Sequence, residues 1–126
     1  MQIWIADDNR KRAGALLKKT VECGQAKKEL KKLSSPNKVI SQLKKSSCDV
    51  LFVGIDRPQF DWVSVVANVC RECPLCNVIF VSDDGDGLDP VSCRSYRISG
   101  YIHTPITQEK VEEELTHLRY APCTSH

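Results

Sequence analysis

The chain lacks any apolar stretch close to the roughly 20 residues that a membrane-spanning helix needs. It also begins directly with an apolar strand-like segment, without the basic lead and apolar core of an export signal. No linker, repeat or low-complexity segment interrupts its 126 residues. We therefore expect one globular domain over residues 1–120, a short tail over residues 121–126, a cytoplasmic location and no membrane contact.

Several catalytic signatures are missing as well. The sequence shows no nucleophile–base pair and no glycine-rich phosphate loop, because Gly85-Asp86-Gly87 is too short and is typical of a turn. The acidic run that begins at Asp83 lacks the ligand spacing of an EF-hand. These absences predict a protein that is not an enzyme and requires no cofactor.

Cysteine, by contrast, is plentiful. The seven cysteines are odd in number and irregularly spaced, which favours free thiols over a disulfide framework. Two residues separate Cys70 from Cys73 and Cys73 from Cys76, a spacing that suits Zn²⁺ or an iron–sulfur cluster. A fourth ligand is not evident, and half-buried structural thiols are the commoner case. A metal- or redox-responsive protein built on these three cysteines is one alternative.

Charge is divided unevenly along the chain. Residues 1–45 contain 12 Lys/Arg and four Asp/Glu, whereas residues 46–126 contain six and 12, so the halves carry +8 and −6. Such polarity can steer association with charged partners. The lysine-rich segments have no interleaved aromatic residues, and a solvated face is favoured over nucleic-acid binding.

The stretch most useful for the fold is residues 50–55, a short apolar run that ends before Pro58. Such a run predicts a strand buried on both faces, as in the middle of a parallel sheet covered by helices. In open sheets of this kind, ligands bind at the carboxyl ends of the strands. Gly54, Asp56 and Arg57 stand at that end of this strand.

Strands and helices are predicted to alternate five times. The strands cover residues 2–6, 25–33, 50–55, 77–82 and 100–103. The second is a lysine-rich edge strand, and its rival is an extension of the preceding helix. The first helix covers residues 10–22, three more follow caps at Ser35, Asp61 and Thr107, and a further short helix is predicted at residues 90–99. This pattern predicts an α/β fold with a doubly wound parallel sheet.

Helical spacing also predicts which side chains are buried. The first helix should bury Ala13, Leu16, Leu17 and Val21, and the third should bury Val63, Val66 and Cys70.

Four motifs in this order resemble the receiver domain of two-component response regulators. They are the acidic pair Asp7-Asp8 after strand one, the string Asp-Val-Leu-Phe-Val-X-Ile-X-X-Pro over residues 49–58, Ser82 at the end of strand four, and Tyr-Ile-His-X-Pro over residues 101–105. The resemblance covers about residues 2–120. It implies a flavodoxin-like, five-stranded parallel sheet in the order 2-1-3-4-5, flanked by five helices.

The resemblance also implies a chemistry. In this family an aspartate at the end of strand three accepts a phosphoryl group, and the acidic pair helps to hold Mg²⁺. A hydroxyl and a lysine contact the phosphoryl oxygens, and an aromatic residue three positions before the lysine responds. Ser82 and Tyr101 match the hydroxyl and the aromatic residue, but the acceptor position is Gly54 and the lysine position is Thr104.

These two departures point to a degenerate receiver, a pseudo-receiver in signal transduction. We expect it to act by phosphorylation-independent protein–protein interaction. The family's partner face, made by the fourth helix, fifth strand and fifth helix, corresponds to residues 90–120. This face could meet a signalling protein or a second copy of the chain, and its acidic end could meet the basic half of another copy.

The altered pocket leaves two questions open. Asp7, Asp8 and Asp56 should gather at one edge, where they could bind Mg²⁺ weakly or be compensated by water and Arg57. Because alternate residues of a strand share a face, Asp56 could also replace the missing acceptor, which makes a response regulator phosphorylated at Asp56 the other alternative. Ser82 and Tyr101 either retain a switch surface or simply pack at the strand ends.

Overall fold

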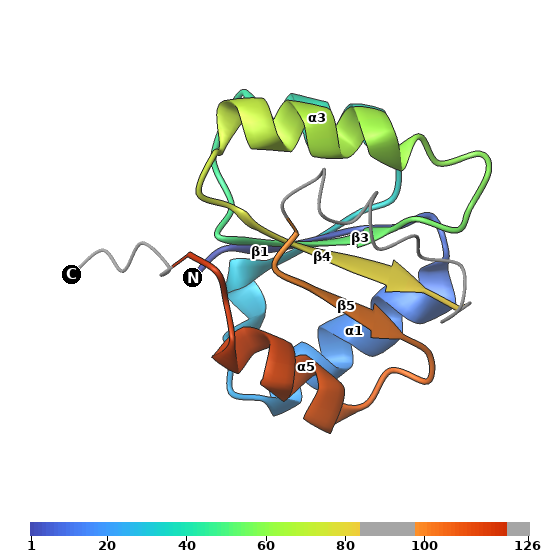
Figure 1. Cartoon of the computed structure of the whole chain (residues 1–126), viewed down its shortest axis with the longest axis vertical. Helices are drawn as coiled ribbons and strands as arrows, with labels where there is room; N and C mark the ends of the chain where they lie inside the picture. The colour runs from blue at the N-terminus through green and yellow to red at the C-terminus, as the bar shows by residue number, and fades with distance from the viewer. Residues whose placement is uncertain (84–97, 121–126) are drawn as a thin grey trace.

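A computed structural model of the chain describes residues 1–83 and 98–120, and these residues form a five-stranded parallel sheet (Figure 1). The strand order is β2-β1-β3-β4-β5, as predicted. The strands are β1 (Ile3–Ala6), β2 (Leu30–Leu33), β3 (Val50–Gly54), β4 (Asn77–Ser82) and β5 (Gly100–His103). The central position of β3 follows from this order.

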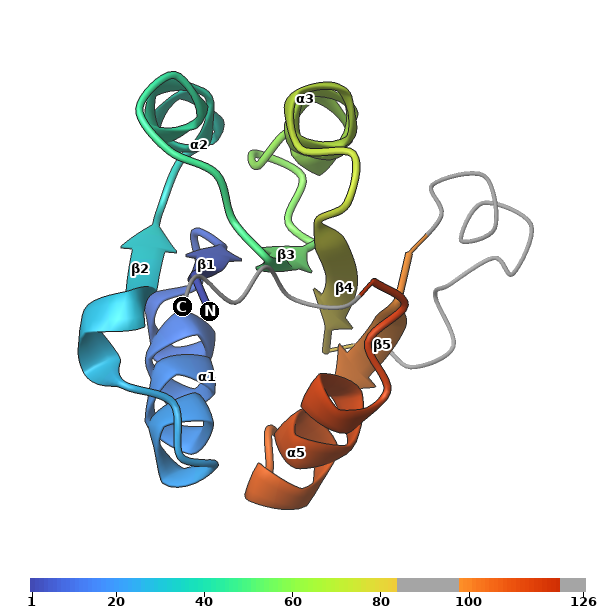
Figure 2. The same ribbon diagram turned by 90° about the vertical axis from the view of Figure 1, so that its left-hand side faces the viewer.

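Helices cover both faces of the sheet, with α2 and α3 on one face and α1 and α5 on the other (Figure 2). Their bounds are α1 (Arg10–Glu22), α2 (Pro36–Leu43), α3 (Trp62–Glu72) and α5 (Gln108–Thr116). The remaining predicted helix, residues 90–99, falls largely outside the described residues. None of the helices in the described part is long and apolar enough to cross a membrane.

Local sequence determines where the helices begin. Asn9, Ser35, Asp61 and Thr107 each accept a hydrogen bond from the backbone N–H three residues further on. Such caps satisfy amide groups that the helix itself leaves unpaired. Three of the four caps were predicted, and Gly24, which has a φ of 99°, follows the carboxyl end of the first helix.

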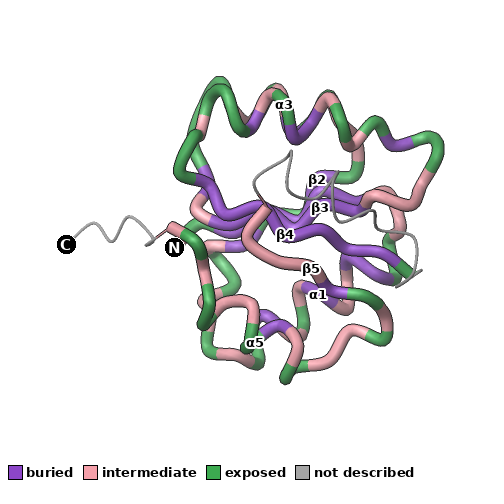
Figure 3. Tube along the Cα trace, viewed as in Figure 1, coloured by how far each residue is buried: buried purple, intermediate pink, exposed green. Residues whose placement is uncertain are grey.

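Strand β3 is buried along its whole length, and its neighbours in the sheet are buried too (Figure 3). Successive side chains of β3 alternate between the two layers. Val50 and Phe52 join the core on the α1/α5 side, whereas Leu51 and Val53 join the core on the α2/α3 side. The same alternation directs position 54 toward α1.

Two predicted helix faces need correction. Val21, Val63 and Cys70 are exposed, because they lie on the flanks of their helices. The buried face of α1 centres on Leu16 and Thr20, whose hydroxyl donates to the Leu16 carbonyl oxygen at 2.6 Å. The sheet-facing residues of α3 are Val65, Val66 and Val69.

The predicted second strand was correct in kind and too long. A 3₁₀ turn over Lys27–Glu29 comes first, and β2 begins at Leu30. β2 pairs with β1 at the edge of the sheet, which excludes the rival helix extension. Its two lysines, Lys31 and Lys32, are exposed, in keeping with the charge that edge strands favour.

Candidate functional site at the carboxyl end of the sheet

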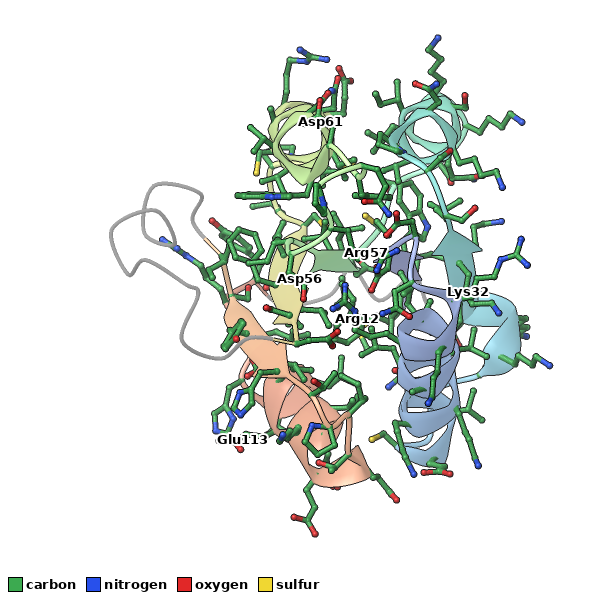
Figure 4. The ribbon with its side chains drawn as sticks, turned by 90° about the vertical axis from the view of Figure 1, so that its right-hand side faces the viewer. Arg12, Lys32, Asp56, Arg57, Asp61 and Glu113 are labelled. Atoms are coloured by element: carbon green, nitrogen blue, oxygen red, sulfur yellow. The ribbon has the colours of Figure 1, made fainter. Side chains whose placement is uncertain are left out.

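Charged side chains gather where β1 and β3 end. Figure 4 shows Arg12, Asp56 and Arg57 close to this edge, whereas Lys32 and Glu113 lie away from it. Asp7 follows β1 and is buried, and Asp56 stands two residues beyond the end of β3. The sequence therefore predicted correctly that carboxylates meet here.

The cation between these carboxylates is Arg12, from the first turn of α1. Its side chain is only 2% exposed. Nε donates to Asp7 Oδ2 at 2.6 Å and Nη2 donates to Asp7 Oδ1 at 3.0 Å, which makes the pair bidentate. Nη1 donates to Asp56 Oδ2 at 3.0 Å, and Nη2 lies 2.8 Å from Asp56 Oδ1. The planar guanidinium thus joins two strands to the helix.

The ion pairs keep these groups charged. Burial opposes the charge of Arg12, but the hydrogen bonds and negative charges of Asp7 and Asp56 outweigh burial and raise the pKa of the guanidinium. Burial would likewise raise the pKa of Asp56. The hydrogen bonds from Arg12 and from the Asp83 amide, together with the charge of Arg12, lower this pKa below its ordinary value. The site is held as a charged network at neutral pH.

Gly54 leaves the space that Arg12 occupies. A Cβ atom at position 54 would lie 2.6 Å from Arg12 Nη2 and 2.7 Å from the Asp7 carboxyl carbon. Carbon atoms do not approach other heavy atoms this closely without displacement, and the guanidinium cannot move without breaking its bonds to Asp7. A side chain at position 54 and the present position of Arg12 therefore exclude each other.

A second ion pair lies beside the first and is more exposed. Arg57 Nε donates to Asp8 Oδ1 at 3.0 Å, and their side chains are 39% and 19% exposed. Asp8 thus has the compensation by Arg57 that the sequence suggested. Arg12 was missed, although it precedes the buried Leu16 by four residues and so shares its helix face.

Solved structures of receiver domains share this architecture. The receiver domain of NtrX from Brucella abortus superposes with a TM-score of 0.76 at 14% identity, covering 91% of this chain and 98% of that one. The receiver domain of AraT from Geobacillus stearothermophilus gives 0.75 at 16% identity, covering 91% and 89%. The chain has the receiver fold.

A third similar structure is a response regulator from Burkholderia pseudomallei with a phosphorylated aspartic acid and a calcium ion. Its TM-score is 0.75 at 16% identity, and the match covers 94% of this chain but only 66% of that longer one. Identities this low establish a shared fold alone. Neither a protein-family model nor a curated protein sequence matches the chain.

In this fold, the side chain of Asp56 points toward the charged network around Arg12, as the alternation of strand residues predicted. Its Oδ2 accepts the backbone N–H of Asp83 at 2.7 Å and the hydroxyl of Ser82 at 3.4 Å, in addition to Arg12. Asp83 extends the network, because its Oδ1 lies 3.2 Å from Arg12 Nη1. Ser82 is therefore part of the charged network as well as the end of β4.

Tyr101 and Thr104, the predicted switch residue and the altered lysine position, lie toward β5. The amide of Thr104 donates to the Ser82 carbonyl oxygen at 3.0 Å, which holds the two strand ends together. Tyr101 is partly buried against the α2/α3 side of the core, and its ring centroid is 5.9 Å from that of His103. The switch role of Tyr101 stays a prediction.

A divalent cation would compete with Arg12 for the oxygens of Asp7 and Asp56. In the described residues, no group of three or more His, Cys, Asp or Glu side chains is arranged to hold a metal ion. The residues present therefore do not fit Mg²⁺ while Arg12 keeps its position. Weak Mg²⁺ binding at Asp7, Asp8 and Asp56 stays a prediction that requires Arg12 to move.

The three predicted cysteines do not stay together as a set. Cys70 is exposed on α3, whereas Cys73 and Cys76 lie at the amino end of the sheet with Cys48. Cys48 was not considered in the sequence because it stands far from the others along the chain.

Proposed function

We propose that this chain is a receiver-fold signalling module that acts by protein–protein contact and takes no part in phosphoryl transfer. The observation that supports this proposal is the position of Arg12. Its guanidinium fills the space next to Gly54, the position at which receiver domains carry the phosphoacceptor, and it pairs with Asp7 and Asp56.

The site around Arg12 would lack two requirements of the receiver cycle. A receiver needs an acceptor carboxylate and an acidic pocket that is free to hold Mg²⁺. Here the acceptor carboxylate is missing, and an internal cation already neutralises the acids. Removing one partner of a buried ion pair costs about 3 to 5 kcal/mol, so the network resists opening. We infer that the carboxyl end of the sheet is held in one state.

A module without a phosphorylation step must signal through a surface. The proposed surface is the receiver face over residues 90–120, of which β5 and α5 are described. Exposed acidic residues on α5, Glu109, Glu112 and Glu113, give it negative charge, opposite to the lysine-rich first half of the chain. A protein partner, or the basic half of a second copy, fits this charge. We place this activity in the cytoplasm.

The first test is intact mass after incubation with Mg²⁺ and acetyl phosphate, a small donor that needs no partner kinase. We expect no phosphoryl adduct. An adduct that disappears in Asp56→Asn would refute the proposal and favour a response regulator that is phosphorylated at Asp56. An adduct that survives in Asp56→Asn would place the acceptor elsewhere and refute it too.

A restored variant serves as the positive control. Gly54→Asp, Arg12→Ala and Thr104→Lys, combined in one chain, return the acceptor and the lysine and remove the competing cation. We expect this variant to take up a phosphoryl group under the same conditions, provided that circular dichroism shows the wild-type fold. Labelling of the restored variant but not of the wild type would assign the block to these positions.

A further inference from the structure

Three thiols meet at the amino end of the sheet, opposite the Arg12 pocket. Cys48 stands two residues before β3, Cys76 stands immediately before β4, and Cys73 caps the carboxyl end of α3. The pairing of Val50 with Asn77 brings the segments that precede β3 and β4 side by side. Figure 2 shows the molecule from this end.

The thiols lie close together, and backbone hydrogen bonds hold the segment that carries Cys73 and Cys76. Cys48 Sγ lies 3.3 Å from Cys76 Sγ, and the two residues are only 5% and 6% exposed. The Cys76 amide donates to the Cys73 carbonyl oxygen at 2.9 Å, and the Cys73 amide donates to Val69 at 2.7 Å. Cys73 is half-buried, so it is the member of the group that small molecules in solution can reach.

The pKa values of the Cys73 and Cys48 thiols are shifted in opposite directions. Hydrogen bonds from Cys48 lower the pKa of the Cys73 thiol to about 6, although burial and the charges of Glu72 and Asp49 act in the opposite direction. The pKa of Cys48 is raised, because its proton bonds to Cys73 and Cys76 and because the residue is buried. At neutral pH, Cys73 is the thiolate and Cys48 keeps its proton.

We propose that Cys73, Cys48 and Cys76 form a peroxide-reactive thiol site, in which Cys73 is oxidised first and Cys48 then forms a disulfide. The Cys73 thiolate attacks one oxygen of hydrogen peroxide, the O–O bond breaks, and hydroxide leaves and is protonated to water. The product is a sulfenic acid. The Cys48 sulfur attacks the Cys73 sulfur, the S–O bond breaks, and the hydroxyl leaves as water with the Cys48 proton. One peroxide thus oxidises two thiols to one disulfide and yields two waters.

Cys76 is placed for the next step. Its sulfur already lies 3.3 Å from that of Cys48, so it can exchange into the new disulfide and return Cys73 to the thiolate. This inference does not depend on the proposed function, because it concerns the opposite end of the sheet.

Two other described cysteines provide matched controls. Cys70 is on α3, three residues before Cys73, and is more exposed than Cys73. Cys23 is half-buried, and burial together with Glu112 and Glu22 raises its pKa. Cys23 should therefore react slowly with peroxide, since the thiolate is the reactive form.

The experiment treats the reduced full-length chain with stoichiometric hydrogen peroxide near neutral pH and follows intact mass and disulfide-linked peptides. We expect one disulfide that joins Cys48 to Cys73 or Cys76. Cys73→Ser should slow its formation roughly tenfold or more, because the thiolate that starts the reaction is gone. Cys70→Ser should leave the rate unchanged.

A second variant tests the role of Cys48. In Cys48→Ser we expect a sulfenic acid on Cys73 that a dimedone-type reagent traps and that peptide mapping locates. A Cys73–Cys76 disulfide in this variant would overturn the assignment of Cys48.

Three further results would overturn the site itself. They are wild-type reaction rates in Cys73→Ser, first oxidation at Cys23 or Cys70, and a disulfide that involves Cys93 or Cys123, which lie outside the described residues. Circular dichroism of each variant distinguishes a chemical effect from loss of the fold.

Discussion

The two ends of the sheet differ in which polar groups they bury and in how those groups are paired. At the carboxyl end, one guanidinium and two carboxylates are charged and must pair, and Arg12 does so with both Asp7 and Asp56. At the amino end, Cys48 and Cys76 are buried with little charge and meet at 3.3 Å. Buried ions are expensive unless they are paired, whereas thiols are tolerated as small apolar groups. Loss of a charged partner at the carboxyl end should therefore cost more free energy of unfolding than loss of a thiol at the amino end, where the side chains are free to change chemically.

Removal of Arg12 should produce the largest loss of stability. Arg12→Ala leaves Asp7 buried without its bidentate partner, which should lower the free energy of unfolding by about 3 to 5 kcal/mol. Urea unfolding followed by circular dichroism measures the change. A loss well below 1 kcal/mol would show that the carboxyl end does not depend on this ion pair.

A methyl group at position 54 should have the next largest effect. In Gly54→Ala the new Cβ would crowd Arg12 and Asp7, and we expect a loss of roughly 1 to 3 kcal/mol, as for other overpacked sites. Gly14→Ala is the matched control, because no atom lies within 4 Å of its added Cβ and alanine favours a helix. Gly14→Ala should stabilise the protein by about 0.5 to 1 kcal/mol.

Combining the two changes tests the cause. If Arg12 makes position 54 intolerant, Gly54→Ala should be milder in an Arg12→Ala background. Additive losses in the double variant would assign the crowding to Asp7 or to the backbone.

A substitution at the amino end should cost less than one at Arg12. Cys48→Ala removes one small buried sulfur and no charge, and we expect a loss of about 1 kcal/mol. It should also raise the pKa of Cys73 from about 6 toward the usual value of about 8.5, because the hydrogen bond that lowers it is gone. The pH dependence of alkylation at Cys73 measures this shift, and an unchanged profile would refute the role of Cys48.

Acid should weaken the carboxyl end selectively. The pKa of Asp56 is lower in the folded protein than in the unfolded chain, so its contribution to stability is complete above the unfolded value of about 3.9. That contribution is lost as pH falls through the folded value. Below about pH 4 the free energy of unfolding should therefore fall more steeply in the wild type than in Asp56→Asn. Parallel curves would show that Asp56 carries no such linkage.

The exposed pair beside the pocket should matter least. Asp8→Asn weakens a bond to Arg57, whose side chain is 39% exposed, and surface pairs of this kind contribute about 0 to 1 kcal/mol. The same urea experiment should show almost no change, and added salt should reduce the remainder. A loss as large as that of Arg12→Ala would mean that the two ion pairs act as one unit.

The sequence by itself determined the framework of this protein. The apolar runs of β1, β3 and β4 and the caps at Ser35, Asp61 and Thr107 are local features, and local features specify strands and helix starts. The alternation of strands and helices indicated a parallel sheet, and the resemblance to receiver domains implied the strand order and placed Asp7 and Asp56 at its carboxyl edge. The glycine at position 54, where the resemblance implies an acceptor aspartate, was also evident, because it depends on one position in a motif.

The tertiary structure alone decided that Arg12 fills the space beside Gly54 and that Cys48 meets Cys76. Arg12 looked like one of several basic residues at the start of a helix, and only the packing of α1 against β1 and β3 turns it inward. Cys48 and Cys76 are 28 residues apart, and the register of β3 with β4 brings them together. Helical or strand periodicity describes one element at a time, whereas these two contacts depend on how separate elements pack.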